Sequence, residues 1–228
     1  MARKINTEKK KKKKIGFKIF ILLLIVLLVL SGFGIFGKGP FKGMKKWFAG
    51  NQNKPIEVKV LDEVKDFGYK ISDRDTKYYK EEFAKLKKII NEDPIDNKQY
   101  AEYVARMFVN DLYTMSTKVN KYDVGGIEYY HKNDLDDFTK SVMDTLYKTM
   151  LDDTYGTREQ KLPEVASVET VSVEETTYDV DGTKLDGYKV VLKWTYVNDM
   201  GYDNQGTVIV VPEGNSGRWS VVDYQNKI

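Results

Sequence analysis

The longest apolar run of the chain lies near its start. Residues 19–36 read IFILLLIVLLVLSGFGIF and contain no charged side chain. A helix rises about 1.5 Å per residue, so this run, with the apolar residues just before it, spans a bilayer core of about 30 Å. Lipid offers backbone groups no hydrogen bonds, which leaves a helix as the expected state. The pattern predicts one transmembrane helix over residues 19–36.

Basic side chains crowd in front of this run. Arg3, Lys4, residues 9–14 and Lys18 are all basic. Positively charged flanks of a membrane span stay in the cytoplasm. The sequence therefore predicts a cytoplasmic tail over residues 1–18 and a C-terminal domain outside the cell, held at the cell membrane by a single pass.

A cleaved signal peptide is the alternative interpretation of this segment. Its apolar region would be shorter, about 7–15 residues, and would end at small residues. The best cleavage position, after Ala49, would place Trp47 where a small side chain is needed. The length and the missing cleavage motif favour an uncleaved anchor.

A linker is predicted between the span and the folded domain. Residues 37–54 are rich in Gly, Lys and Asn, which is typical of irregular structure. Residues 56–71 alternate between apolar and polar positions, which fits either a short strand or an irregular lead-in. We assign residues 37–71 to this juxtamembrane linker and lead-in.

Three stretches of the remaining chain repeat their apolar residues at helical spacing. Residues that favour helix caps precede each stretch, and a proline follows the first. The predicted helices run from Ser72 or Asp73 to Pro94, from Asp96 to Val119, and from Asn133 or Asp134 to Met150.

The apolar period then changes to the alternation of strands. The connections DVDGTK, NDMGYDNQ and EGNSG are turn sequences, and such short connections favour antiparallel neighbours. The fold class predicted for residues 72–228 is α+β, with three helices packed on a four-stranded antiparallel sheet. The predicted strands are Val165–Tyr178, Leu185–Val197, Gly206–Pro212 and Arg218–Tyr224.

The chain has a basic N-terminal part and an acidic remainder, which we call the acidic body. Residues 1–54 hold 14 basic side chains and one acidic side chain, whereas the rest holds 23 basic and 33 acidic ones. An acidic body excludes nucleic acid as the expected partner of the outer domain. The lysine tail suits anionic lipid headgroups, and binding to a cytoplasmic nucleic acid or protein is its alternative.

Composition also limits the chemistry. The chain has no Cys and one His, so thiol nucleophiles, disulfides and multi-histidine metal sites are excluded. We interpret His131 as a capping or solvent-facing residue. The sequence Asp179-Val180-Asp181-Gly182 is interpreted as a hairpin turn rather than a calcium loop, because the further ligands are missing. The sequence predicts no enzymatic activity, no metal and no cofactor.

The order of three helices before four strands, with a last strand reading GRWSVVDY, resembles the nuclear-transport-factor-two-like fold. The resemblance covers residues 72–226 and implies a cone-shaped α+β domain. Membrane-anchored versions are scaffold proteins of conjugation and type IV secretion systems, and the chain is also similar to small anchored proteins of Gram-positive bacteria. The resemblance implies docking to other envelope proteins or self-association.

The same resemblance implies a pocket between the helices and the sheet. In isomerase relatives, an Asp and a Tyr act in that pocket. The corresponding candidates for ligand binding in this chain are Asp111 and Tyr113 on the second helix, with Trp194 and Tyr196 on the second strand. Plain core packing is the alternative role for the aromatic residues. An anchored interaction module is the first functional hypothesis, and a ligand-binding or enzymatic pocket is the second.

Overall fold

The computed structural model describes residues 54–226. The predicted tail, residues 1–18, and the predicted transmembrane helix, residues 19–36, lie outside the described residues. Residues 37–53 of the predicted linker lie outside them as well. One compact unit begins at Lys54 and contains all the described elements. It is an α+β unit with three helices and a four-stranded antiparallel sheet, as the sequence predicts.

The lead-in segment forms a small antiparallel hairpin. Strand β1 covers Val60–Val64 and pairs with β2, Tyr69–Ser72. Gly68 provides the positive φ of 74° that the turn between them requires. The Tyr69 hydroxyl donates a 2.5 Å hydrogen bond to the carbonyl oxygen of Trp219, far along the chain. This bond holds the hairpin against the last strand, so the segment is part of the folded unit.

The three helices are α3, Lys77–Ile90; α4, Asn97–Tyr113; and α5, Leu135–Asp144. Helix α4 starts near Asp96 as predicted. Asp96 caps it, because its carboxylate accepts hydrogen bonds from the backbone of Lys98 and Gln99. The predicted cap of α3 is wrong. Thr76 caps this helix, while the Ser72 and Asp73 backbones still belong to the end of the hairpin.

The predicted C-terminal ends of α4 and α5 are also wrong. Helix α4 stops at Tyr113, and α5 stops at Asp144. In both cases, apolar residues continue at helical spacing beyond the end and are buried in another backbone conformation. Met115 begins the short 3-10 helix η3, Met115–Thr117, and Met150 lies in irregular structure after a turn. Periodicity reports which residues are buried, but not which backbone conformation buries them.

The four strands form an antiparallel meander in the order β3-β4-β5-β6. Gly187 in β4 lets two strands approach closely, since a Cβ there would lie 2.4 Å from the carbonyl oxygen of Val210. The alternation predicted for β4 is confirmed, with Val190 and Leu192 buried and Lys193 exposed. The strands are β3, Val165–Val180; β4, Thr183–Tyr196; β5, Gln205–Pro212; and β6, Trp219–Asn226.

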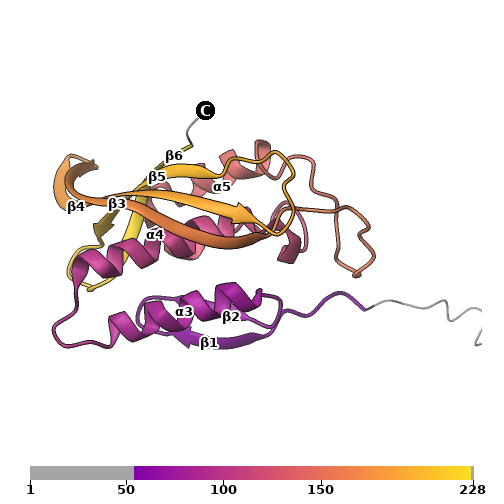
Figure 1. Ribbon diagram of the computed structural model, residues 1–228, viewed down its shortest axis with the longest axis horizontal. Helices are drawn as coiled ribbons and strands as arrows, with labels where there is room; N and C mark the ends of the chain where they lie inside the picture. Colours follow the sequence, from indigo (N-terminus) through magenta and orange to yellow (C-terminus); the bar gives the residue numbers. More distant parts are fainter. Residues whose placement is uncertain (1–53, 227–228) are drawn as a thin grey trace, which may run out of the picture. The chain divides into compact units, whose positions relative to one another are not determined.

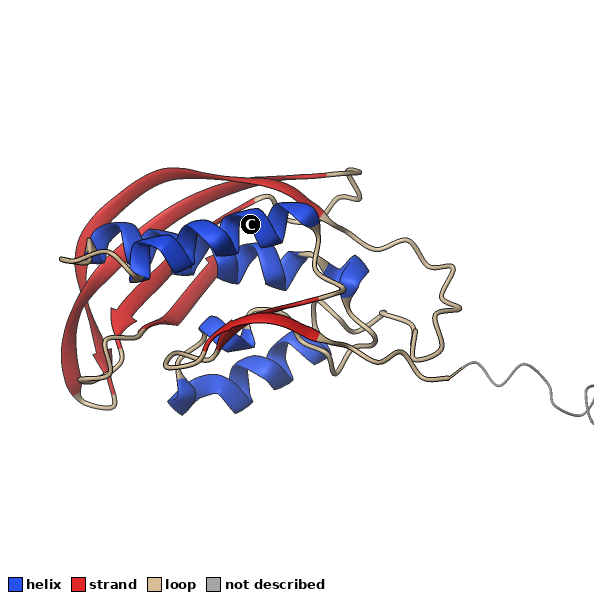
Figure 2. Cartoon of the chain, turned by 90° about the horizontal axis from the view of Figure 1, so that it is seen from below, coloured by secondary structure: helices blue, strands red, loops and turns tan. Residues whose placement is uncertain are grey.

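Helix α4 is the centre of the unit. Figure 1 shows it between the sheet on one side and α3 with the β1–β2 hairpin on the other, and Figure 2 shows the sheet curving around the helices. A helix covered on several sides is apolar around most of its circumference. The fully buried residues of α4 include Tyr100, Val104, Met107, Phe108 and Val109.

Candidate functional site

The structure brings three of the four predicted ligand-binding residues together. The Tyr113 ring lies 4.9 Å from that of Trp194 and 6.4 Å from that of Tyr196, measured between centroids. The Tyr113 hydroxyl is 2.8 Å from the Tyr224 hydroxyl, and the Trp194 indole donates to the Tyr196 hydroxyl at 2.8 Å. These aromatic residues fill the space between α4 and the sheet, so they form core at the position where the fold resemblance implies a pocket.

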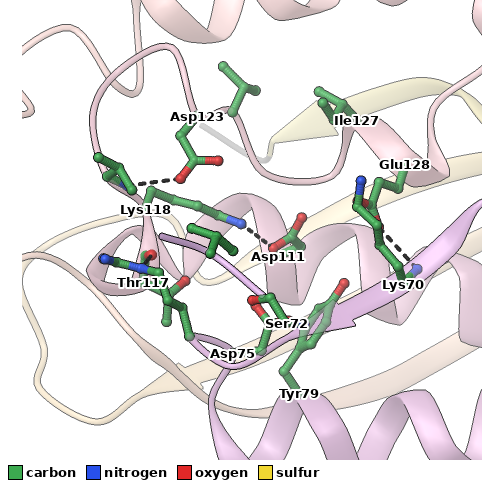
Figure 3. Close-up of a pocket in the computed structure, with 14 residues that line it drawn as sticks. Lys70, Ser72, Asp75, Tyr79, Asp111, Thr117, Lys118, Asp123, Ile127 and Glu128 are labelled. Atoms are coloured by element: carbon green, nitrogen blue, oxygen red, sulfur yellow. Dashed lines mark hydrogen bonds and ion pairs between the residues drawn. The ribbon is translucent and has the colours of Figure 1, made fainter. Parts of the chain in front are cut away.

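Asp111 lies apart from this aromatic cluster. It precedes Tyr113 by two residues, and side chains two apart on a helix point about 200° away from each other. Asp111 faces a cleft of about 400 Å³ on the other side of α4. Figure 3 shows this cleft, with side chains from β2, the start of α3, the end of α4 and the loop after α4 directed toward it.

The first ion pair on the cleft floor joins Asp111 to Lys118. The Lys118 ammonium is 2.5 Å from one carboxylate oxygen of Asp111, and both residues are 8% exposed. The backbone N–H of Gly126 donates to the other oxygen at 2.6 Å. Burial disfavours the charged ammonium, but the Asp111 carboxylate outweighs this effect and the net pKa of Lys118 is raised. Lys118 therefore stays charged in the cleft.

Two adjacent glycines explain why the loop after α4 contacts Asp111. A Cβ at Gly125 would lie 2.1 Å from the Asp111 carbonyl oxygen, so a residue larger than glycine cannot take this backbone path. The next residue, Gly126, has a φ of 81° and turns its N–H onto the Asp111 carboxylate. The paired glycines thus bring the loop directly onto α4.

The second ion pair joins β2 to the short helix η4, Ile127–Tyr129. The Lys70 ammonium lies 3.0 Å from one oxygen of the Glu128 carboxylate, and the Lys70 backbone N–H donates to the other oxygen at 3.3 Å. Burial raises the pKa of Glu128 against the opposing effect of Lys70. This pair closes one wall of the cleft (Figure 3).

Asp75 contributes a carboxylate without an ion pair. One of its oxygens accepts a hydrogen bond from the Ser72 backbone at 2.5 Å, and none of the cations in residues 54–226 lies within ion-pair distance. Burial raises the pKa of Asp75 and the negative charge of Asp111 adds to the effect, which outweighs the opposing effects of the Ser72 hydrogen bond and the Lys118 ammonium. Asp75 is thus a partly buried carboxylate that a bound cationic or hydrogen-bonding group would stabilise.

The rim of the cleft is apolar and exposed. Val58 is 48% exposed and Ile127 is 37% exposed, and both line the cleft opening. Tyr122, beside the lining residue Asp123, is 70% exposed. Exposed apolar and aromatic side chains around a polar centre are typical of surfaces that bind other molecules.

The other candidate residues have structural roles. His131 is buried, and its Nδ1 accepts a hydrogen bond from the Asn133 backbone, in agreement with a capping role. Asp179 and Gly182 form the hairpin turn between β3 and β4, where the Asp179 carboxylate accepts from the Gly182 N–H at 2.8 Å. Within residues 54–226, no group of three or more His, Cys, Asp or Glu side chains is placed to hold a metal ion.

Comparison with known proteins does not assign the chain to a family or a function. No protein-family model, curated protein or solved structure matches the chain. Across the part of the chain that the structure describes, no helix is long and apolar enough to cross a membrane.

Sequence reasoning found Asp111 but missed its neighbours in the cleft. Lys118, Asp75, Lys70 and Glu128 come from four separate segments, and each has an ordinary charged side chain. The signal that could have pointed to them is the pair of glycines at 125 and 126. Adjacent glycines between two helical segments indicate a close backbone approach, and this approach forms the cleft.

Proposed function

We propose that this chain is a single-pass membrane-anchored protein whose extracytoplasmic domain is an interaction module that docks another envelope protein. The uncharged run at 19–36 and the lysines before it support the anchor and its orientation. The lysine tail adds contacts to anionic lipid headgroups on the cytoplasmic side. The acidic outer domain, by contrast, repels nucleic acid.

The observation that carries the proposal is the cleft at the end of α4. The cleft holds the Asp111–Lys118 and Lys70–Glu128 ion pairs and the unpaired Asp75 carboxylate, and its rim exposes Val58 and Ile127. Apolar anchors around a preorganised polar centre provide both affinity and orientation in protein interfaces. A partner segment with an apolar side chain and a cationic or amide group would match this arrangement.

The second functional hypothesis, a ligand-binding or enzymatic internal pocket, has less support. That hypothesis needs open space between α4 and the sheet, whereas Tyr113, Trp194 and Tyr196 pack against each other there. Recognition is therefore expected at the surface cleft. The resemblance to conjugation and secretion scaffolds extends the proposal to a role in such machinery, where the partner is another component of the envelope complex.

Site-specific photocrosslinking in cells of the native host tests this proposal. We would place p-benzoylphenylalanine at Ile127 on the rim or at Val171, which is 51% exposed and lines a different surface hollow. The proposal predicts a discrete adduct with another envelope protein from position 127 and none from position 171. An adduct with the mass of two copies of the chain would instead indicate self-association.

A charge variant provides the specificity control. Asp75→Asn keeps the side-chain shape but removes the unpaired negative charge, so the yield of the position-127 adduct should fall while the amount of protein stays constant. Equal crosslinking from positions 127 and 171, or no adduct from either, would contradict docking at the cleft.

A further inference from the structure

A second groove lies at the opposite end of α4. It has a volume of about 780 Å³ and is formed by the β3–β4 hairpin, the junction of β5 and β6, and the first residue of α4. Asn97 and Asp111 are 14 residues apart on α4, which corresponds to about 21 Å along the helix, so the groove is separate from the cleft. Residues that line it include Asn97, Glu175, Thr177, Asp186, Tyr188 and Trp219.

Strand register places two carboxylates on one face of the hairpin. Glu175 lies directly opposite Tyr188, and Thr177 lies directly opposite Asp186. Positions 175 and 177 are two apart on β3, so Glu175 and Asp186 are diagonal neighbours on the same face of the sheet. Both are exposed, and neither forms an ion pair with any cation within residues 54–226. The residues lining the groove carry two negative charges and no positive charge.

An aromatic surface lies beside these carboxylates. The rings of Tyr188 and Trp219 are 5.5 Å apart between centroids and both line the groove. Burial raises the pKa of the Tyr188 hydroxyl, and the nearby carboxylates of Glu175 and Asp96 raise it further, which indicates a negative potential at the ring. Asp96 also caps α4, so its charge offsets the positive end of the helix dipole that faces this region.

We propose that this groove binds an arginine or lysine side chain of a partner polypeptide. The cation stacks on the face of Tyr188, and the Glu175 and Asp186 carboxylates accept its hydrogen bonds. The groove matches such a side chain in charge, and a cation over an aromatic ring with two carboxylates beside it is favourable at a partly desolvated site. This second site is independent of docking at the cleft, so either interaction can exist without the other.

A titration of the full chain in lipid nanodiscs tests the groove with a defined probe. The probe is N-acetylarginine amide, and its neutral counterpart is N-acetylcitrulline amide, which has the same shape without the charge. The chain contains three tryptophans, so ¹⁵N-tryptophan labelling gives three indole signals, which single Trp→Phe variants assign. The arginine probe should shift the Trp219 signal saturably and leave the Trp194 signal in place. The citrulline probe should have no effect.

Substitution of the two carboxylates provides the second part of the test. Glu175→Gln combined with Asp186→Asn should weaken binding of the arginine probe by about tenfold, which corresponds to about 1.4 kcal/mol in total, because the two substitutions remove both negative charges from the hydrogen bonds to the probe. Glu174→Gln, an exposed neighbour that does not line the groove, is the matched control and should bind as the unmodified chain does.

Three outcomes would overturn the proposal: no shift of Trp219, equal shifts with both probes, or unchanged affinity in the double variant. Because both substituted side chains are exposed, the double variant should fold, and an unchanged Trp194 signal verifies this. The cleft proposal is tested separately by crosslinking at Ile127, so failure of one site leaves the other intact.

Discussion

At the scale of a single residue, the Asp75 carboxylate makes the folded state less stable than a neutral side chain of the same shape would. Its carboxylate is partly buried, lacks an ion pair among the described cations and lies near the negative Asp111. An asparagine of the same shape could accept the Ser72 hydrogen bond without the cost of a desolvated charge. A charged group in an environment that raises its pKa is a frequent sign of a binding site.

The pH dependence of stability follows from this environment. Because the pKa of Asp75 is raised in the folded state above its ordinary value of 3.8, its charge disfavours folding at neutral pH, and the penalty disappears as the carboxyl becomes protonated in acid. Asp75→Asn should therefore raise the melting temperature at pH 7 and give no increase near pH 3.5. Thermal unfolding followed by circular dichroism measures this difference.

The control for this prediction is Asp66→Asn. Asp66 is exposed in the turn between β1 and β2, and its substitution should change the free energy of unfolding by less than about 0.5 kcal/mol at either pH. An Asp75→Asn variant that is less stable than the unmodified chain at pH 7 would show that the Asp75 carboxylate stabilises the fold, which is the opposite of the predicted effect.

At the scale of elements, the loop after α4 shapes the cleft. Its path depends on Gly125, whose backbone touches the Asp111 carbonyl oxygen, and on Gly126, which donates to the Asp111 carboxylate. Lys118, at the start of the same loop, completes the ion pair. Gly125, Gly126 and Lys118 of this one loop therefore all contact Asp111 of α4.

A methyl group at position 125 tests this arrangement. Gly125→Ala would place a Cβ 2.1 Å from a backbone oxygen that cannot move without distorting α4, and overpacking of this kind destabilises by about 3 kcal/mol. Chemical denaturation should show this loss, together with weaker crosslinking from Ile127. In contrast, Gly201→Ala, which meets no atom within 4 Å, should lose only about 1 kcal/mol from its positive φ.

Elements were predictable from the sequence to different degrees. The four strands and their order follow from alternation and turn chemistry, because each connection is short and local. The helix starts at Asp96 and near Asp134 also follow from local signals. The ends of α4 and α5 do not, because tertiary contacts replace the α-helix by a 3-10 helix after α4 and by turns after α5, and these bury apolar residues of the same pattern. The cleft forms where residues 70–79 meet residues 111–128, and no local pattern encodes this contact.

At the scale of the whole molecule, the proposed function requires the chain to be divided between two environments. The basic residues at the N-terminus and the apolar run predict an anchored N-terminal part. The folded unit beginning at Lys54 carries both proposed binding sites. If the folded unit faced the cytoplasm, envelope partners outside the cell could not reach either site. Orientation is therefore the claim on which the proposed function depends most.

The chain has no cysteine, so a single introduced thiol reports its own location. We would label Asn215→Cys, in the exposed turn between β5 and β6, and Thr7→Cys, in the N-terminal tail, with a membrane-impermeant maleimide on intact cells. We predict labelling at position 215 before lysis and labelling at position 7 only after lysis. Protection of position 215 in intact cells, with position 7 labelled, would contradict the proposed orientation.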